Sequence, residues 1–275
     1  MPGPFTLSFD IGGTHLKASV LAADGTLTAE PVHVVTPHPA KPEHVVGLLQ
    51  RLARRLPRYD RISVGFPGVV RDGVIISAPH LGTEDWHGFP LAAALAKRLG
   101  KPVRVLNDAE VQGFGVISGK GLELVLTLGT GLGSALFWHG RPTPHLELSQ
   151  HPIHGHKTYD DYLGDAALDA KGKKKWNHHV AFALDVVRRV VNFDRLYIGG
   201  GNARKLHKEL PDDVEIVSNV AGITGGVALW NPANDGLFSD AGQVSAPRGK
   251  PAKRAALRTT GRARAARRRK SAGAS

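Results

Sequence analysis

Hydrophobic residues along the chain form short runs that alternate with segments in which apolar positions recur every three or four residues. Two of these runs, at residues 6–11 and 15–22, are separated by two glycines and a threonine, a pattern that predicts a β-hairpin. After Asp24-Gly25 we expect an extended stretch. Residues 44–56 combine helical apolar spacing with arginines on the other face, which predicts an amphipathic helix. Strands and helices that alternate in this way indicate an α/β fold with a largely buried sheet.

A second unit of apolar run, glycine-rich turn and apolar run lies at residues 122–137. It predicts a weak internal repeat and two lobes. In chain order, the other predicted elements are a strand that begins at residue 61 and ends in Gly65, Pro67 and Gly68, a helix over 90–99, a strand over 103–108, a helical region over 159–191, a strand over 196–201 followed by a helix start at 202–206, a strand over 214–218 and a final helix over 221–230. We therefore expect an N-terminal α/β lobe of residues 1–118, a C-terminal α/β lobe of residues 119–240 and a tail of residues 241–275.

The formal net charge of +12 is concentrated in this tail. Residues 246–275 contain 11 of the 36 lysines and arginines and no acidic residue, so the rest of the chain is close to neutral. Because the tail has no aromatic residue and is rich in Ala, Arg, Gly and Ser, we expect it to be disordered. Two interpretations stay open, a solubilising tail and an arm that makes nonspecific contacts with a polyanion such as nucleic acid.

The composition excludes several other classes of protein. The chain has no cysteine, which excludes disulfides and thiolate metal sites. No segment approaches about 18 uninterrupted apolar residues, so no membrane span is expected. The N-terminal sequence lacks the basic and apolar regions of a signal peptide, and we expect a cytoplasmic protein.

Three glycine-rich turns, each after an apolar run, are the first candidates for a binding site. They are Gly12-Gly13-Thr14, residues 129–133 and residues 199–201. Glycine turns allow backbone N–H groups to approach an anion without a Cβ in the way. Asp10, beside the first turn, would repel a phosphate directly, so its natural role is to hold a metal ion or the water of that ion against the phosphate.

Asn107 and Asp108 end another apolar run. An aspartate at the end of a strand in a cleft can accept a proton from a substrate hydroxyl. The alternative is an Asx turn or a helix cap before the following segment AEVQGFG, and that local pattern alone favours the cap.

Together these motifs resemble the ROK family of sugar kinases. The resemblance covers roughly residues 5–230 and rests on DIGGTHLK at 10–17, GFPG at 65–68, LND at 106–108, GTGLG at 129–133 and IGGG at 198–201. It implies a two-lobed actin-like ATPase or hexokinase (ribonuclease H-like) fold. Within the family the chain looks most like the polyphosphate glucokinases, on the segments GVV at 68–70, LTLGTGLGSALF at 126–137, HLE at 145–147 and KKKWN at 173–177.

The resemblance also implies a role for each motif. Asp108 would be the catalytic base that deprotonates the sugar 6-hydroxyl. The first phosphate loop would comprise Asp10, Gly12, Gly13, Thr14 and Lys17, with Asp10 holding Mg²⁺ through water. The second would comprise Gly129, Thr130, Gly131 and Gly133, whereas Gly199, Gly200, Gly201, Lys173, Lys174 and Lys175 would contact a nucleotide or polyphosphate. Sugar contacts would come from Gly68, Asn107, His145 and Glu147.

One segment departs from the family pattern. ROK kinases usually have Glu-x-Gly-His at the sugar site, and aligning that pattern with residues 142–145 puts Pro142 at the glutamate and Pro144 at the glycine, with His145 retained. A proline ring cannot replace a carboxylate that binds sugar hydroxyls, so Glu147 is the residue that could compensate. The cysteine-rich zinc motif of many ROK proteins is also missing.

A cluster of histidines and a cluster of lysines lie further along the chain, and each can be either a binding site or an ordinary solvated segment. The histidines of residues 151–156 could bind zinc, but the absence of cysteine and of a close carboxylate favours a solvated loop. The lysines of residues 171–175 could be a solvated helix face or a track for a polyphosphate chain, whose many charges reward clustered cations.

The function expected from the sequence is phosphorylation of glucose or a related hexose at the 6-hydroxyl, with polyphosphate or ATP as donor and Mg²⁺ as cofactor. The resemblance also implies a homodimer. The alternative is a catalytically weak or inactive ROK-fold protein that binds a sugar and regulates another process. The repressors of the family have a helix-turn-helix domain before the first phosphate loop, and here that loop's strand starts at about residue 5, which favours the kinase.

Overall fold

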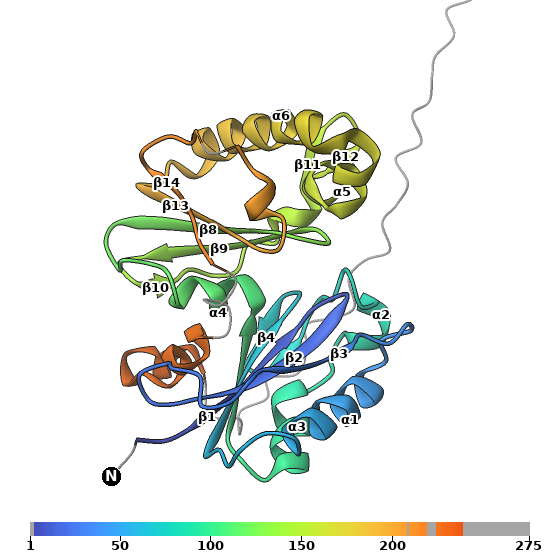
Figure 1. Ribbon diagram of the computed structural model, residues 1–275, viewed down its shortest axis with the longest axis vertical. Coiled ribbons are helices and arrows are strands. Elements are labelled where there is room, and N and C mark those ends of the chain that lie inside the picture. Colours follow the sequence, from blue (N-terminus) through green and yellow to red (C-terminus); the bar gives the residue numbers. More distant parts are fainter. Residues whose placement is uncertain (1–2, 208, 219–223, 239–275) are drawn as a thin grey trace, which may run out of the picture. The chain divides into compact units, whose positions relative to one another are not determined.

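Two five-stranded sheets form the framework of the protein (Figure 1). The computed structural model describes residues 3–207, 209–218 and 224–238. The first sheet has the strand order β3-β2-β1-β4-β7 and the second β10-β9-β8-β13-β14. The strands of the first sheet are β1 Thr6–Ile11, β2 His15–Leu21, β3 Val32–Val35, β4 Arg61–Phe66 and β7 Val103–Asn107. Those of the second are β8 Leu122–Leu128, β9 Leu132–Trp138, β10 Arg141–Pro142, β13 Arg195–Gly199 and β14 Val214–Ile216.

The two sheets share one topology. Each begins with an antiparallel meander, β1-β2-β3 in the first and β8-β9-β10 in the second. Two further strands then run parallel to the first strand of the meander. Glycine turns join the corresponding strands, β1 to β2 and β8 to β9. The α/β fold predicted from the sequence is therefore confirmed, and the weak internal repeat is a repeat of topology.

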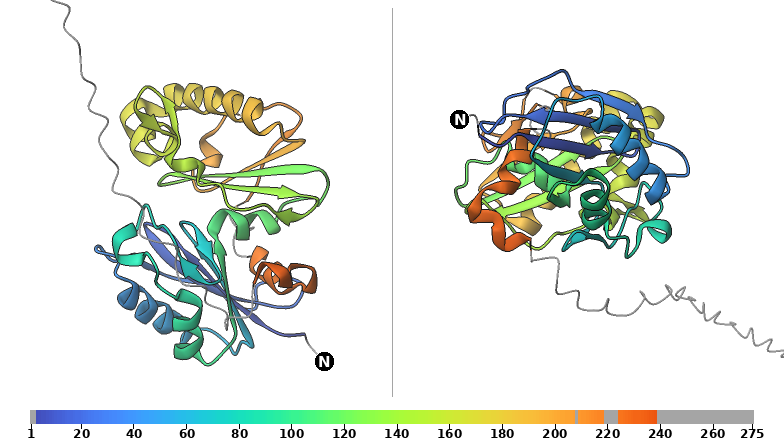
Figure 2. Two further views of the ribbon diagram at one scale, coloured as in Figure 1. Left: turned by 180° about the vertical axis from the view of Figure 1, so that it is seen from behind. Right: turned by 90° about the horizontal axis from the view of Figure 1, so that it is seen from below.

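Helices α1 (Pro42–Ala53) and α3 (Leu91–Leu99) cover one face of the first sheet (Figures 1 and 2). Helix α1 begins with a proline, whose fixed φ suits a first helical turn, and its buried residues recur every three or four positions. Helix α3 ends at Gly100, which has the left-handed φ of 67° that favours glycine at a helix end. Their apolar faces join the buried side chains of β1, β2 and β4 in one core.

Helices α5 (Tyr159–Leu163) and α6 (Asp165–Val191) cover the second sheet. The sequence predicted a single helical region here, and the structure divides it. Gly164 ends α5 in an extended conformation, and Gly172 (φ 72°, ψ 159°) interrupts α6. The buried residues of α6, including Trp176 and Val180, pack on the second core.

Helix α4 (Asp108–Phe114) packs against both sheets, since it contacts β4 on one side and β8 and β9 on the other. The short 3₁₀ segments η3 (Gly225–Trp230) and η4 (Pro232–Leu237) follow the second sheet in sequence but return to the first. Ser63 of β4 donates a hydrogen bond to the carbonyl of Gly226 at 2.6 Å, and Arg104 of β7 lies over the ring of Trp230. The expected lobes of residues 1–118 and 119–240 stay a prediction, and these contacts favour grouping residues 225–238 with the first sheet.

The predicted strand that begins at residue 61 ends at Phe66, within the glycine and proline segment where the sequence placed its end, because Pro67 has no N–H for the ladder. Two local predictions were wrong in detail. The helix predicted at 202–206 is only the 3₁₀ turn η2 (Ala203–Lys205), and within the final helix predicted over 221–230 the described part is the 3₁₀ segment η3. Residues 221–223 and the predicted tail lie outside the described residues.

Shorter elements fill the connections. They are β5 Val70–Arg71, β6 Val74–Ile75, α2 Thr83–Trp86, η1 Leu148–Gln150, β11 Pro152–His154 and β12 Lys157–Thr158. None of the helices in the described ranges combines the length and apolarity that a membrane crossing requires.

A buried carboxylate fixes the point where the chain passes from the first sheet to the second. Glu123 is fully buried, and its oxygens accept hydrogen bonds from the backbone N–H groups of Ser118 (2.6 Å), Gly119 (2.8 Å) and Lys120 (3.1 Å). The hydroxyl of Tyr197 donates a fourth bond at 3.0 Å. Because a buried carboxylate needs such donors, the loop between α4 and β8 is held in one conformation.

We expect Glu123→Gln to destabilise the protein by about 3 kcal/mol, because the new NH₂ group faces backbone donors that then lose their acceptor. Urea denaturation followed by circular dichroism measures the change. Tyr197→Phe is the matched control, since it removes a single donor and costs about 1 kcal/mol. A Glu123→Gln protein as stable as the wild type would contradict this role of the carboxylate.

Candidate active site

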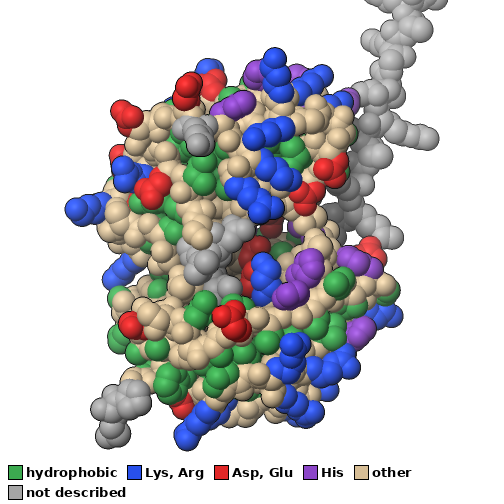
Figure 3. Space-filling view, viewed as in Figure 1, with side chains coloured by type: hydrophobic (Ala, Val, Ile, Leu, Met, Phe, Trp, Pro, Cys, Tyr) green, Lys and Arg blue, Asp and Glu red, His purple; other side chains and the backbone are tan. Residues whose placement is uncertain are grey.

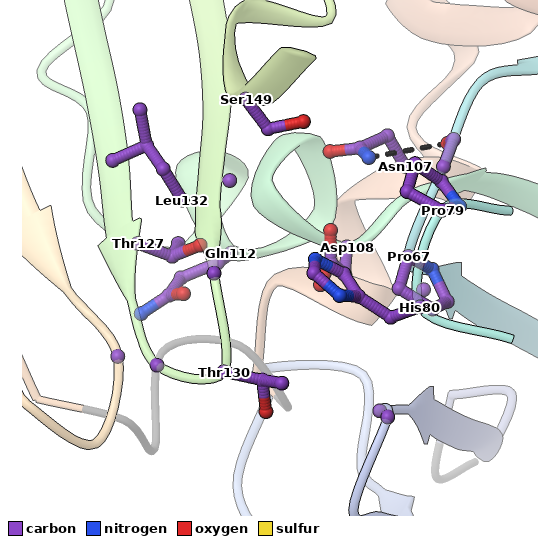
Figure 4. Close-up of a pocket in the computed structure, with 18 of the residues that line it drawn as sticks. Pro67, Pro79, His80, Asn107, Asp108, Gln112, Thr127, Thr130, Leu132 and Ser149 are labelled. Carbon is purple, nitrogen blue, oxygen red and sulfur yellow. Dashed lines mark hydrogen bonds between the residues drawn. The ribbon is translucent and has the colours of Figure 1, made fainter. Parts of the chain in front are cut away.

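A cleft between the two sheets brings together most of the residues singled out in the sequence (Figures 3 and 4). Figure 3 shows the hollow with acidic side chains inside it. Fourteen predicted site residues line the cleft: Asp10, Gly12, Gly13, Lys17, Gly68, Asn107, Asp108, Gly129, Thr130, Gly131, Gly133, Glu147, Gly200 and Gly201. The predicted residues that do not line it are Thr14, His145, Lys173, Lys174, Lys175 and Gly199.

The first glycine turn and its aspartate stand at the end of β1. Asp10 and Lys17 are paired across the antiparallel strands β1 and β2, and the Lys17 Nζ lies 3.1 Å from Asp10 Oδ2. Both side chains remain partly exposed to the cleft. Thr14 lies at the margin, where its hydroxyl is 3.4 Å from that of Thr130 in the second turn. The two glycine turns therefore face each other.

Asn107 and Asp108 stand where β7 ends and α4 begins. The Asn107 Oδ1 accepts from the N–H of Ala109, and the side chain of Glu110 returns to the Asn107 N–H, so these residues form a capping box. The Asn107 amide also donates to the carbonyl of Gly68 at 3.2 Å. The helix cap that the sequence analysis gave as an alternative role for these residues is therefore present. It also fixes the position of Asp108 in the cleft.

Asp108 has an unusual protonation equilibrium. Burial raises its pKa, and the negative charges of Asp10 and Glu147 add to the rise. Together they bring the pKa of Asp108 to about 7. The N–H of Ala109, which donates to Asp108 Oδ1 at 2.9 Å, and the positive charge of His145 act in the opposite direction. A carboxyl with a pKa near neutrality can both accept and release a proton under ordinary conditions.

The segment after β10 contributes one wall of the cleft. Glu147 and Ser149 line the cleft, and the Ser149 hydroxyl donates to Glu147 Oε1 at 2.6 Å. His145 lies behind them, with Nδ1 3.2 Å from Glu110 Oε1 and Nε2 3.8 Å from Glu147 Oε2. Pro142 pairs with Phe137 at the sheet edge and does not line the cleft.

The charges in this wall are coupled. Burial alone would lower the pKa of His145, but the hydrogen bond to Glu110 and the negative charges of Glu110 and Glu147 outweigh it and raise the pKa to about 9. Burial would likewise raise the pKa of Glu147, and the positive charge of His145 together with the hydrogen bond from Ser149 lowers it instead. A protonated His145 beside an ionised Glu147 follows from both shifts, so the glutamate presents a carboxylate to the cleft.

Gly200 and Gly201 form the far edge of the cleft. Gly200 has a φ of +87°, and a Cβ there would lie 2.3 Å from the carbonyl oxygen of Leu128, so only glycine fits. The buried amide of Asn202 donates to the carbonyl of Gly129 at 3.3 Å and to Asp165 at 2.6 Å. These bonds join the third glycine turn to the second.

The lysine and histidine clusters lie away from the cleft. The three lysines of residues 173–175 are exposed on α6. His154 stacks on Tyr162 with ring centroids 5.6 Å apart, and His151 packs near Tyr159. Among the described residues no group of three or more potential side-chain ligands (His, Cys, Asp or Glu) is arranged to hold a metal ion.

Sequence reasoning missed several residues that line the cleft. They include Pro79, His80, Gln112, Thr127 and Ser149. His80 pairs with Asp160, which is far away in the sequence and lies in α5. No local motif marks either residue, and only the fold brings them together.

Comparison with known proteins agrees with this architecture. The model of the ROK family matches residues 6–161. A polyphosphate glucokinase of Mycobacterium leprae (strain TN) is 30% identical over 237 residues, which cover 78% of this chain and 71% of the relative. The crystal structure of an inorganic polyphosphate/ATP-glucomannokinase from Arthrobacter sp. strain KM superposes with a TM-score of 0.75 at 29% identity, covering 82% of this chain and 98% of that one.

A more distant structure shows the same fold. A ROK family glucokinase from Streptomyces griseus, in complex with glucose and AMPPNP, has a TM-score of 0.67 at 19% identity and covers 82% of this chain and 98% of its own. The resemblance inferred from the motifs is confirmed, because the family model matches more than half of the chain. The protein belongs to the ROK family.

Proposed function

We propose that the protein is a sugar kinase that transfers a phosphoryl group from polyphosphate or ATP to the 6-hydroxyl of glucose or a related hexose. The observation that supports it best is the placement of Asp108 in a cleft whose walls include a glycine turn from each sheet. The names of the relatives, polyphosphate glucokinase and polyphosphate/ATP-glucomannokinase, agree with this reaction.

The reaction needs little covalent chemistry from the protein. Asp108 accepts the proton of the sugar hydroxyl while that oxygen forms a bond to the terminal phosphorus and the bridging P–O bond of the donor breaks. The leaving group is ADP or a polyphosphate shortened by one unit. The backbone N–H groups of the glycine turns hold the phosphates, so the chain contributes mainly position and charge stabilisation.

The donor set at Asp10 fits a magnesium ion that is shared with the substrate. Asp10 is a single carboxylate, and no three-ligand cluster stands beside it among the described residues. Mg²⁺ is commonly held by one or two carboxylates, water and substrate phosphates, so this donor set suits it. When bound, the ion would neutralise charge on the donor. Asp10 would hold it through water, and Lys17 would lie beside it.

Glu147 is the residue we propose for the sugar hydroxyls, with Asn107 and Gly68 on the opposite wall. The segment Glu147-Leu148-Ser149-Gln150 begins with a glutamate and contributes two residues to the cleft, whereas the segment 142–145 contributes none. We therefore propose that the Glu-x-Gly-His pattern of the family corresponds to residues 147–150, with Ser149 and Gln150 in place of glycine and histidine. His145 then supports Glu147 from behind.

Three further points concern the phosphoryl donor, the oligomeric state and the location of the protein. We propose that polyphosphate or ATP enters between the glycine turns and that a long polyphosphate reaches the lysines of residues 173–175. A homodimer and a cytoplasmic location stay predictions. The contacts predicted for the tail fall outside the described residues. An inactive sugar-binding protein gains no support from the comparisons, whose named relatives above are kinases.

We expect Asp108→Asn to lower kcat by about 10²- to 10⁴-fold, because the amide cannot accept the hydroxyl proton. A coupled assay for glucose 6-phosphate, run with Mg²⁺ and either polyphosphate or ATP, measures the loss. An Asp108→Asn enzyme with the wild-type kcat would contradict the assignment. Activity with neither donor in the folded wild type, across several hexoses, would contradict the proposed function itself.

We expect Glu147→Gln to raise the KM for the hexose by about 10-fold, because a hydrogen bond to a charged group is stronger than one to an amide. The KM for the donor should stay unchanged. Pro142→Ala is the matched control, since Pro142 lies outside the cleft. If Pro142→Ala changed the KM for the hexose and Glu147→Gln did not, residues 142–145 would be the sugar segment instead.

A further inference from the structure

His80 stands between the two glycine turns of the cleft. It lies in the loop between β6 and α2 and lines the cleft (Figure 4). A Cβ built on Gly13 would be 3.4 Å from the Cβ of His80, and one built on Gly131 would be 2.6 Å from its Nε2. The imidazole therefore spans the gap from the first turn to the second, and a side chain at residue 131 would displace it.

Asp160 holds this imidazole from the second lobe. The Nε2 of His80 lies 3.1 Å from Asp160 Oδ2. The other oxygen of Asp160 accepts from the N–H of Leu132 at 2.7 Å, and the Gln150 amide lies 3.3 Å from Oδ2. The carboxylate is thus attached to the second glycine turn itself, which fixes the ring over Gly131.

The surroundings of His80 favour its charged form. The hydrogen bond that His80 donates to Asp160 raises the pKa of His80, burial opposes it, and the charges of Asp160, Asp108 and Glu147 add to the rise. These acids come from three different elements, α5, α4 and the segment before η1. Lys17 is the other cationic residue that lines the cleft in the described part of the chain.

We propose that His80 is a further catalytic residue, a cation that contacts the phosphoryl donor between the two glycine turns and stabilises charge on the transferred group. This inference rests on the proposed phosphoryl transfer in the cleft. A fixed positive charge at the place where negative charge develops lowers the barrier without reorganisation. Asp160 is then a positioning residue that orients the ring and keeps it charged.

If the His80–Asp160 pair had only a structural role, it would hold the same segments together. The test therefore measures the pH dependence of activity, which depends on the charge of His80. The proposal requires Asp108 ionised and His80 protonated. The first condition gives the pH–activity profile an acid limb, because activity rises as pH rises through the pKa of Asp108. The second condition gives the profile an alkaline limb, because activity falls as pH rises through the pKa of His80.

The experiment compares His80→Gln, Asp160→Asn and the matched control His87→Gln, an exposed histidine at the end of α2. We expect His80→Gln to lower kcat by about 10²-fold with both donors and to abolish the alkaline limb. Asp160→Asn should move that limb to lower pH, because the ring loses the carboxylate that charges it. His87→Gln should match the wild type. An alkaline limb that both cleft variants leave in place would overturn the proposal.

A binding measurement keeps the test independent of catalysis. Calorimetric titration with tripolyphosphate and Mg²⁺ should show weaker binding to His80→Gln than to the wild type at pH 6.5, with a difference that shrinks as pH rises through the pKa of His80. If the wild type bound tripolyphosphate but transferred no phosphoryl group to any hexose, the proposed function would be wrong. The comparison of affinities would still test whether His80 contacts the phosphates. Equal affinity of wild type and His80→Gln at pH 6.5, or no binding to either, would overturn the inference.

Discussion

The carboxylate of Glu110 connects the parts on which the cleft depends. One oxygen accepts from the N–H of Asn107 and closes the capping box at the start of α4. The other lies 3.2 Å from His145, whose far nitrogen faces Glu147. A single buried acid therefore sets the direction of the helix that bears Asp108 and the position of the charged histidine behind the opposite wall. The geometry of both substrate walls depends on this one side chain.

The cleft is a concentration of negative charge that must still accept a negative substrate. Asp10, Asp108 and Glu147 all line it. Their mutual repulsion contributes to the elevated pKa of Asp108, while His145 limits the rise. A phosphate chain can enter only if cations and backbone N–H groups offset this field, which is the physical reason for the roles proposed for His80 and for Mg²⁺.

Much of the fold was predictable because its signals are local. The hairpin around Gly12 and Gly13, the strand that ends at Asn107 and the glycine turn at 129–133 depend on short-range pattern, and they lie where the pattern put them. The pairing of His80 with Asp160 and the return of Trp230 to the first sheet depend on contacts between distant segments. No periodicity encodes such contacts. The sequence alone allowed the Glu-x-Gly-His pattern to be aligned with residues 142–145 on the strength of His145. Which part of this loop lines the cleft is a property of the fold, and it is the segment that holds Glu147 and Ser149.

The return of residues 225–238 to the first sheet has a mechanical consequence. The chain passes from the first sheet to the second before β8, and after β14 it returns to pack residues 225–238 on the first sheet. A single break in the chain before β8 would therefore leave the second sheet covalently attached to a segment that still packs on the first. The two sheets are held together by the contacts of this segment as well as by the continuous chain.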